Sequence, residues 1–241
     1  MPSKNSNTDV VILCLNQIEV IERSLRRLRK EDHNVIVVDN GSDDDSHERL
    51  KTYDWITLVR NEENKGASVG RNSGLDKSTA EFVFLLDGDI QYVPGSVDGM
   101  EQLMRAMPDA GCIGVHNVER WNGTRTLEEA DAKWPENPGL PTSVFPMAWT
   151  QFGLFRGDLL RKVRFIEEGA FGEAGNGYED NYLYMDILKA GLKSYYLPDV
   201  LYYHEAHGGQ KWLTEKGMDN KNTERRVIFD RAWNEYLESI A

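Results

Sequence analysis

The stretch EFVFLLDGDI, residues Glu81–Ile90, is an apolar segment that runs directly into two aspartates. Its apolar part predicts a buried strand that ends at Asp87 and Asp89. Residues two apart in an extended segment face the same side, and open α/β sheets bind ligands at the carboxyl ends of their strands. Two carboxylates in that position suit Mg²⁺ or Mn²⁺. The alternative is a strand followed by an ordinary Asp-Gly turn.

The chain around this stretch alternates between strand and helix patterns. Strands are predicted at 9–15, 34–38, 55–60, 81–86, 111–117, 147–155, 195–197 and 200–203. Helices are predicted at 17–30, 46–52, 66–74, 94–107, 159–163, 180–190 and 223–240. Alternation of this kind is typical of a parallel sheet with helices on both faces. We therefore predict an α/β fold with a Rossmann-like, mostly parallel sheet flanked by helices.

Composition limits the class of protein. The chain has 28 Lys and Arg against 40 Asp and Glu, a net charge of -12, which disfavours non-specific binding to nucleic acid. Basic residues on helices 17–30 and 223–240 leave the binding of a polyanion open. The longest apolar run, Val10–Leu15, is too short to cross a bilayer. The polar N-terminus lacks the apolar core of a signal peptide, and the only two cysteines, Cys14 and Cys112, fit a reduced compartment. We expect a cytoplasmic protein.

The segment 119–146 breaks the alternating pattern. It is rich in proline and tryptophan and shows little periodicity. Irregular segments of this length are usually functional or disordered, and Trp121 and Trp134 argue against disorder. Two interpretations stay open: an insertion that binds an acceptor, or a lid that packs on the core for stability.

Four segments carry a family resemblance. They are VVILCLNQIEVIERSL (10–25), VIVVDNGSDDDS (35–46), NEENKGASVGRNSGLDKSTAEFVFLLDGD (61–89) and GNGYEDNYLYMDILKAGLKSYYLPDVLYYH (175–204). In this order and spacing they strongly resemble the GT-A-fold nucleotide-sugar glycosyltransferases of the family 2 type. The resemblance implies one catalytic domain over 1–241. Its nucleotide-sugar-binding half is 9–117, its acceptor-side half is 118–218, which includes the insertion 119–146, and its C-terminal helix is 219–241.

The resemblance implies a binding site for a nucleotide-sugar donor. Asp39 would bind the nucleotide base, with Asn16 and Glu19 close to it. Arg71 would face the diphosphate. Gly66 begins the helix before Arg71, and helix N-termini with glycine approaches favour phosphate. Surface ion pairing is the structural alternative for Arg71.

The same resemblance implies a metal site for Mn²⁺ or Mg²⁺. Asp87 and Asp89 would form the metal-binding D-x-D pair: Asp89 would bind the metal directly, and Asp87 would lie closer to the ribose or to a metal-bound water. His204 occupies the position of a third metal ligand after the last strand, and His207 competes for that role. In this arrangement the metal and a cation offset the charge of the leaving diphosphate.

The resemblance also implies how the sugar is transferred. Asp180 matches the catalytic base of inverting members and would deprotonate the acceptor hydroxyl. Glu179 would contact the donor sugar or orient the loop, and Trp212 belongs to a flexible-looking segment suited to close over the donor. The expected donor is a UDP-sugar. The acceptor stays open among a glycan, lipid-linked saccharide, protein, small molecule or modified nucleobase.

Other functions remain as alternatives. A retaining transferase of the GT-A fold would share most of the donor site. A non-catalytic nucleotide-sugar-binding protein is expected to have lost the metal or base positions, whereas all of them are present here. A nucleotidyltransferase usually carries a glycine-rich basic loop after its first strand, where this chain has LNQIEV.

Overall fold

A computed structural model of the chain describes residues 7–120, 134–136, 138, 141–143, 148, 150–172, 177–204 and 222–240. Its strands are β1 (Thr8–Cys14), β2 (Asn34–Asn40), β3 (Thr57–Asn61), β4 (Phe82–Asp87), β5 (Ile90–Gln91), β6 (Ala110–Arg120), β7 (Thr142–Ser143), β8 (Phe152–Arg156) and β9 (Lys193–His204). Its helices are α1 (Ile18–Leu28), α2 (Ser46–Leu50), α3 (Gly66–Leu75), α4 (Ser96–Ala106), α5 (Gly157–Val163), the 3₁₀ helix η1 (Gly169–Gly172), α6 (Glu179–Lys189) and α8 (Asn222–Ile240).

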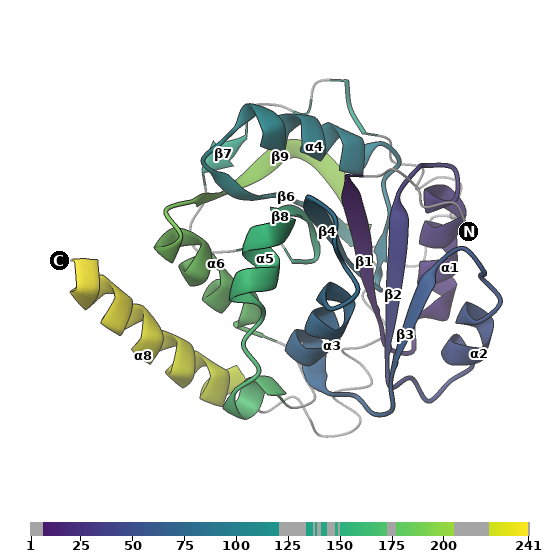
Figure 1. The fold of residues 1–241 in the computed structure, drawn as a ribbon, viewed down its shortest axis with the longest axis horizontal. Coiled ribbons are helices and arrows are strands. Elements are labelled where there is room, and N and C mark those ends of the chain that lie inside the picture. Colours follow the sequence, from purple (N-terminus) through teal and green to yellow (C-terminus); the bar gives the residue numbers. More distant parts are fainter. Residues whose placement is uncertain are drawn as a thin grey trace.

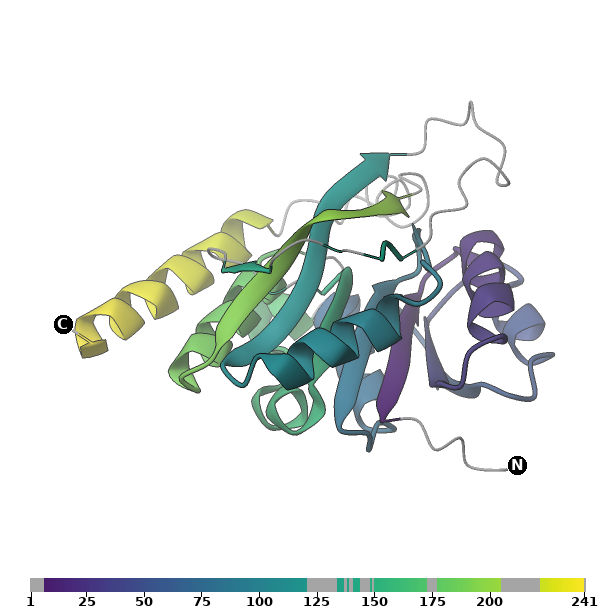
Figure 2. The ribbon, with the colours of Figure 1, turned by 90° about the horizontal axis from the view of Figure 1, so that it is seen from above.

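The strands in the described part of the chain form one nine-stranded sheet with the order β3-β2-β1-β4-β8-β6-β9-β5, and β7 pairs with β9. Strands β1, β2, β3 and β4 pair in parallel, as do β6 and β9, while β8 runs antiparallel between β4 and β6. The sheet is therefore mostly parallel, and the predicted α/β class is confirmed. Figure 2 shows the long strands β6 and β9 running side by side beyond the end of α4.

Helices cover both faces of the sheet (Figure 1). Alternate residues of β1 point to opposite faces, so Val10 and Ile12 belong to one apolar core and Val11 to the other. Helices α1, α2 and α4 contribute to the first core, and α3, α5 and α6 contribute to the second. The two cores hold the sheet rigidly, and the loops at the carboxyl ends of the parallel strands are placed by that frame.

Two details of the sequence prediction are wrong. The segments 195–197 and 200–203 belong to one strand, β9, which passes through Pro198. Its pairing with β6 shifts between Val115 and Asn117, and such an irregularity is where a sheet tolerates proline. Helix α5 begins at Gly157, two residues before the predicted start of the helix 159–163, so Asp158 lies in its first turn.

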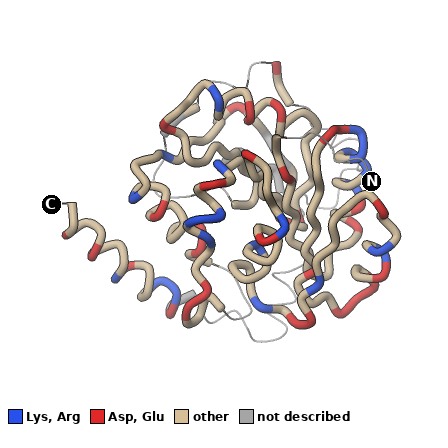
Figure 3. The backbone as a smooth tube through the Cα atoms, viewed as in Figure 1, with Lys and Arg blue, Asp and Glu red and all other residues tan. Residues whose placement is uncertain are grey.

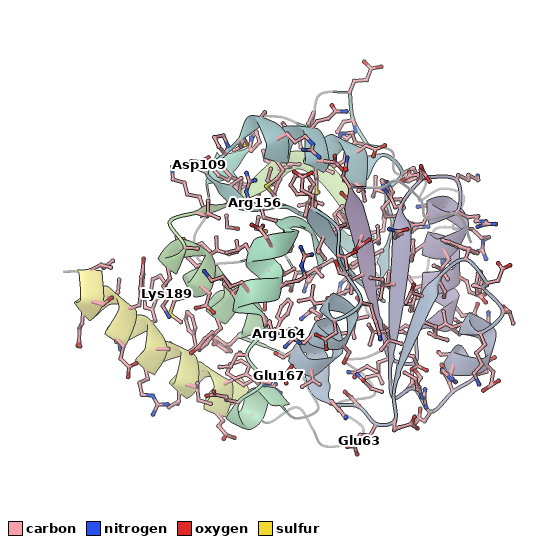
Figure 4. The ribbon with its side chains drawn as sticks, in the orientation of Figure 1. Glu63, Asp109, Arg156, Arg164, Glu167 and Lys189 are labelled. Atoms are coloured by element: carbon pink, nitrogen blue, oxygen red, sulfur yellow. The ribbon has the colours of Figure 1, made fainter. Side chains whose placement is uncertain are left out.

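Arg156 ties the second half of the sheet to α4. At the end of β8, its guanidinium donates hydrogen bonds to the carbonyls of Met104, Met107 and Ala110 at 3.3, 3.1 and 2.7 Å. Figure 4 labels it beside the end of α4. A cation is favourable there because the last carbonyls of a helix have no partner within the helix.

Acidic and basic residues are distributed along the backbone of many of the described elements (Figure 3). Basic side chains follow α1, but Arg27 there donates to the Tyr92 carbonyl at 2.8 Å and Arg29 lies over the Trp55 ring at 5.2 Å. Two of the basic side chains of α1 are therefore engaged in contacts within the protein. Within the described residues, no helix has the length and apolar character needed to span a membrane.

Candidate functional site

The loops that follow β1 and β2 are joined to each other. Asn16 has a positive φ of 56°, and its backbone N–H donates to the Ser42 hydroxyl at 3.0 Å. Its side-chain amide donates to Asp43 at 2.8 Å and accepts from the Asp43 backbone N–H at 2.9 Å. The predicted site residue Asn16 therefore lies at the carboxyl edge of the sheet, next to the end of β2.

Asp39 is completely enclosed by protein. Its side chain is 0% exposed. One carboxylate oxygen accepts from the Ser42 backbone N–H at 2.9 Å, and the other lies 3.0 Å from His47 Nδ1 and contacts the Arg60 guanidinium. His47 and Arg60, which are partly exposed, cover this carboxylate. The role of Asp39 in binding a base stays a prediction.

The motifs in the sequence did not indicate Arg60 and His47 as residues of the site. Arg60 is directly opposite Asp39 in the parallel register of β2 and β3, so the register of the two strands would have indicated this contact. Neither strand alone indicates that register. His47 reaches the same carboxylate from α2, and nothing in its local sequence points there.

Glu19 and Gly66 take part in other contacts. Glu19 is 69% exposed and forms an ion pair with Arg49 of α2, which lowers the Glu19 pKa through its hydrogen bond. Gly66 begins α3 with a φ of 84°. Its N–H donates to the Asn64 side chain at 2.9 Å, and its carbonyl accepts from Asn40 at 3.0 Å. The structure thus places Gly66 beside the end of β2 and turns Glu19 toward α2.

Arg71 connects the two acidic motifs. From the middle of α3, its guanidinium donates to Asp87 at 2.8 Å and to Glu179 at 3.2 Å. The side chain is only 6% exposed and lies over the Phe165 ring at 5.3 Å. Burial opposes the charge of Arg71, but the two carboxylates outweigh it and raise the pKa. Arg71 is therefore a buried, permanently charged bridge.

Asp180 lies beside this bridge at the start of α6. Burial is the main cause that raises the pKa of Asp180 to about 7, the negative charge of Glu179 adds to the shift, and Arg71 opposes it. Glu179 itself is held by Arg71 and by the Gly177 backbone N–H. A carboxylate that titrates near neutral pH is suited to accept a proton from a hydroxyl.

Asp87 belongs to the same acidic cluster. Burial raises the pKa of Asp87, the charge of Arg71 opposes that shift, and the charges of Asp89 and Glu179 raise it further. The four carboxylates Asp87, Asp89, Glu179 and Asp180 and the Arg71 guanidinium thus interact within one region. Such clusters of interacting titratable groups are a feature of functional sites.

Asp89 and His204 form a separate pair. The Asp89 carboxylate lies 3.0 Å from His204 Nε2, and both side chains are slightly under one quarter exposed. The register of β5 with β9, in which Ile90 is opposite His204, brings them together. In the described part of the chain, no three His, Cys, Asp or Glu side chains converge as a metal site. Of the three predicted ligands, Asp89 and His204 meet, whereas Asp87 binds Arg71.

Gly88 separates the two aspartates for a reason of packing. A Cβ atom at Gly88 would lie 2.4 Å from the Leu13 carbonyl oxygen and 2.5 Å from the Gln17 side chain. The structure presses this residue against the end of β1 and the start of α1.

Several predicted features lie outside the described residues. These include Trp212, His207 and most of the segment 119–146. In that segment, Trp134 is described. Its backbone N–H donates to the Pro94 carbonyl at 3.2 Å, and its side chain packs on the first core beside α4. At this one position, the contact agrees with the interpretation in which the segment packs on the core.

The fold is similar to those of solved glycosyltransferases. The mannosyltransferase PcManGT from Pyrobaculum calidifontis, in complex with GDP-Man and Mn²⁺, superposes with a TM-score of 0.64 at 18% identity, over 95% of this chain and 66% of that one. TarS residues 1–349 from S. aureus, in complex with UDP-GlcNAc, superposes with a TM-score of 0.62 at 20% identity, over 84% of this chain and 59% of that one. These similarities establish the GT-A fold.

Curated relatives are distant in sequence. A pre-mycofactocin glycosyltransferase of Mycobacterium tuberculosis is 28% identical over 90% of this chain and 47% of its own length. The uncharacterized glycosyltransferase YibD of Escherichia coli is 25% identical over 80% of this chain and 59% of its own length. The chain thus spans about half the length of these relatives. The model of the glycosyl transferase family 2 matches residues 9–164. With that match and the GT-A fold, the chain belongs to glycosyl transferase family 2.

Proposed function

We propose that the chain transfers a sugar from a nucleotide-sugar donor, a UDP-sugar in the first instance, to an acceptor hydroxyl with inversion at the anomeric carbon. The observation that carries this proposal is the bridge formed by Arg71 between Asp87 and Glu179. It holds the acidic end of β4 and the start of α6, two parts of the chain remote in sequence, at one place. Sugar transfer requires that the donor and the acceptor bind side by side at such a place.

The residues that would hold a divalent metal are Asp89 and His204. Their carboxylate and imidazole lie 3.0 Å apart at the edge of the site, and these two donor types fit Mn²⁺. Oxygens of the donor diphosphate would complete the ligand set. When bound there, the metal would offset the negative charge that develops on the leaving diphosphate.

Arg71 contributes positive charge from inside the protein. Because its guanidinium is already committed to Asp87 and Glu179, it fixes the direction of both carboxylates before substrate arrives. Preorganised charge of this kind stabilises a transition state without a reorganisation cost. We assign Arg71 to this role in place of direct contact with the diphosphate.

Asp180 would act as the base. With a pKa raised to about 7, it is partly deprotonated at neutral pH and binds the acceptor's proton more strongly than an ordinary aspartate. As the acceptor oxygen attacks the anomeric carbon, its proton passes to Asp180. The bond from that carbon to the diphosphate oxygen breaks on the opposite side, so the configuration inverts.

A thermal-shift screen tests this proposal. UDP-, GDP- and dTDP-sugars are each added with and without Mn²⁺, since ligands that bind the native state raise its melting temperature. We expect a metal-dependent shift with one nucleotide class, followed by nucleotide release and an inverted product identified by NMR. No shift with any donor contradicts the proposal, and a product of retained configuration contradicts the role of Asp180.

A further inference from the structure

Helix α8 contacts the segment that carries Glu179 and Asp180. The Phe229 ring on α8, only 8% exposed, lies 6.0 Å from the Tyr178 ring, with 36° between their planes. Tyr178 directly precedes Glu179. Phe229 in turn stacks on Trp233 at 6.0 Å, and Trp233 lies 6.4 Å from the Tyr184 ring of α6. Aromatic contacts therefore join α8 both to α6 and to the residue before it.

Arg225 makes a second connection from α8. Its side chain is buried, with the residue only 2% exposed, and donates to the Ala170 carbonyl at 3.1 and 2.8 Å. Burial lowers the Arg225 pKa, while the charge of Glu179 raises it. Arg225 thus ties α8 to η1, the 3₁₀ helix that precedes Tyr178 in the chain. Figure 1 shows α8 extending along the α6 side of the molecule.

The backbone at Tyr178 needs outside support. Tyr178 has a φ of 64° and follows Gly177 with a φ of 119°. A left-handed conformation is unfavourable for a residue with a Cβ atom, so the local sequence does not favour it. The Tyr178 ring contacts Phe229 while its backbone is in that conformation, and α6 begins at the next residue with Glu179 and Asp180 in its first turn.

We propose that α8 positions the Glu179–Asp180 pair, with Phe229 acting through Tyr178 and Arg225 acting through the Ala170 carbonyl of η1. Both are positioning residues, since their contacts are with the protein and not with reacting atoms. The inference rests on the proposed function of Asp180 as the base. According to this proposal, the C-terminal helix α8 contributes to sugar transfer by positioning the base, in addition to packing against α6.

Hydrogen exchange tests the positioning without any substrate. In the full chain, we expect Phe229→Ala to speed amide exchange over residues 177–182 by about tenfold, as loss of a supporting contact promotes local opening. Tyr236→Ala is the matched control: its ring contacts Trp233 at 5.7 Å, about two turns further along α8. We expect the control to leave this exchange unchanged. Equal acceleration in both variants, or none in Phe229→Ala, overturns the inference.

Turnover provides the second measurement. The probe is release of UDP from the UDP-sugar that the wild type cleaves, with water as acceptor. We expect Phe229→Ala to lower kcat by about ten- to a hundredfold, because small displacements of a catalytic group are costly. KM for the donor should stay unchanged, and Phe229→Tyr should restore kcat.

The two measurements separate the two proposals. If the wild type releases no nucleotide diphosphate from any donor, the proposed function fails, and the exchange experiment still decides the positioning. If the wild type is active and Phe229→Ala keeps its kcat, or loses no more than Tyr236→Ala, the positioning inference fails while the proposed function stands.

Discussion

The Asp89 carboxylate and His204 Nε2 lie 3.0 Å apart, which brings the residue after Gly88 into contact with the last residue of β9. Asp87, two residues before Asp89, turns instead to Arg71. The two aspartates of one short motif thus have different partners. This division leads to different expectations for their substitution.

Metal-dependent donor binding should require both Asp89 and His204. We expect Asp89→Ala and His204→Ala each to abolish the Mn²⁺-dependent part of the thermal shift that a nucleotide-sugar produces, because that shift follows binding to the native state. Asp76→Ala is the control, since Asp76 is an exposed carboxylate paired with Arg164 at 2.7 Å. A full Mn²⁺-dependent shift in either variant would contradict the assignment.

Asp180→Asn should remove the base while donor binding persists. We expect turnover to fall by about 10²–10⁴-fold, the usual range for positioned proton transfer, with the donor Kd within a few-fold of wild type. In the wild type the base acts when deprotonated. With the Asp180 pKa raised to about 7, the rate should therefore rise with pH through about 7 and level off above it. A pH-independent wild-type rate over that range would count against Asp180.

Asp180→Asn should also change the stability of the protein, and the direction of the change follows from the raised pKa of Asp180. A carboxyl group whose pKa is higher in the folded state stabilises the protein when protonated, and this contribution is lost as pH rises from the unfolded pKa toward the folded one. For Asp180 that window extends from the ordinary value of 3.8 to about 7. Asp180→Asn should raise the Tm relative to wild type at pH 8 and have little effect on the Tm at pH 4. Differential scanning calorimetry at both pH values measures these changes.

The strands could be predicted further than the site. Buried parallel strands such as β1, β2 and β4 appear in the sequence as short apolar runs, because both faces of each are covered. Strands β5 and β7 have two residues each, too few to show a period. Strand β9 was divided in two because proline usually ends a strand, and the irregularity that accommodates Pro198 depends on its partner β6.

The site residues followed from the family pattern, but their partners did not. Arg71 and Glu179 are 108 residues apart, and only the tertiary fold brings them together. Similarly, Asp39 is enclosed by Arg60 through the register of two strands. Contacts of this kind depend on tertiary structure, which motif and periodicity do not specify.

Replacement of Arg71 should destabilise the protein strongly. Arg71→Ala leaves Asp87 and Glu179 without their shared cation in a buried site, and losing one partner of a buried ion pair costs about 3–5 kcal/mol. Arg71→Lys should recover part of that loss, since an ammonium lacks the fork that reaches two carboxylates. Urea unfolding at pH 7 measures the free energies.

An exposed arginine provides the control for Arg71. Arg105 also binds two carboxylates, Glu81 at 2.7 Å and Glu101 at 2.9 Å, but its side chain is 44% exposed. Ion pairs at the surface contribute about 0–1 kcal/mol, so Arg105→Ala should change stability little. Equal losses for Arg71→Ala and Arg105→Ala would mean that burial of the Arg71 bridge has no energetic consequence.

Gly88→Ala should damage the site through packing. The added methyl group would lie 2.4 Å from the Leu13 carbonyl, a backbone atom that cannot move without distorting β1, so we expect a loss of about 1–3 kcal/mol and weaker donor binding. Gly191→Ala is the contrasting control: its φ of 76° is strained, but nothing lies within 4 Å of the new atom, and it is remote in sequence from Asp87 and Asp89. It should lose stability and keep donor binding, whereas normal donor binding by Gly88→Ala would show that the two aspartates tolerate a shifted backbone.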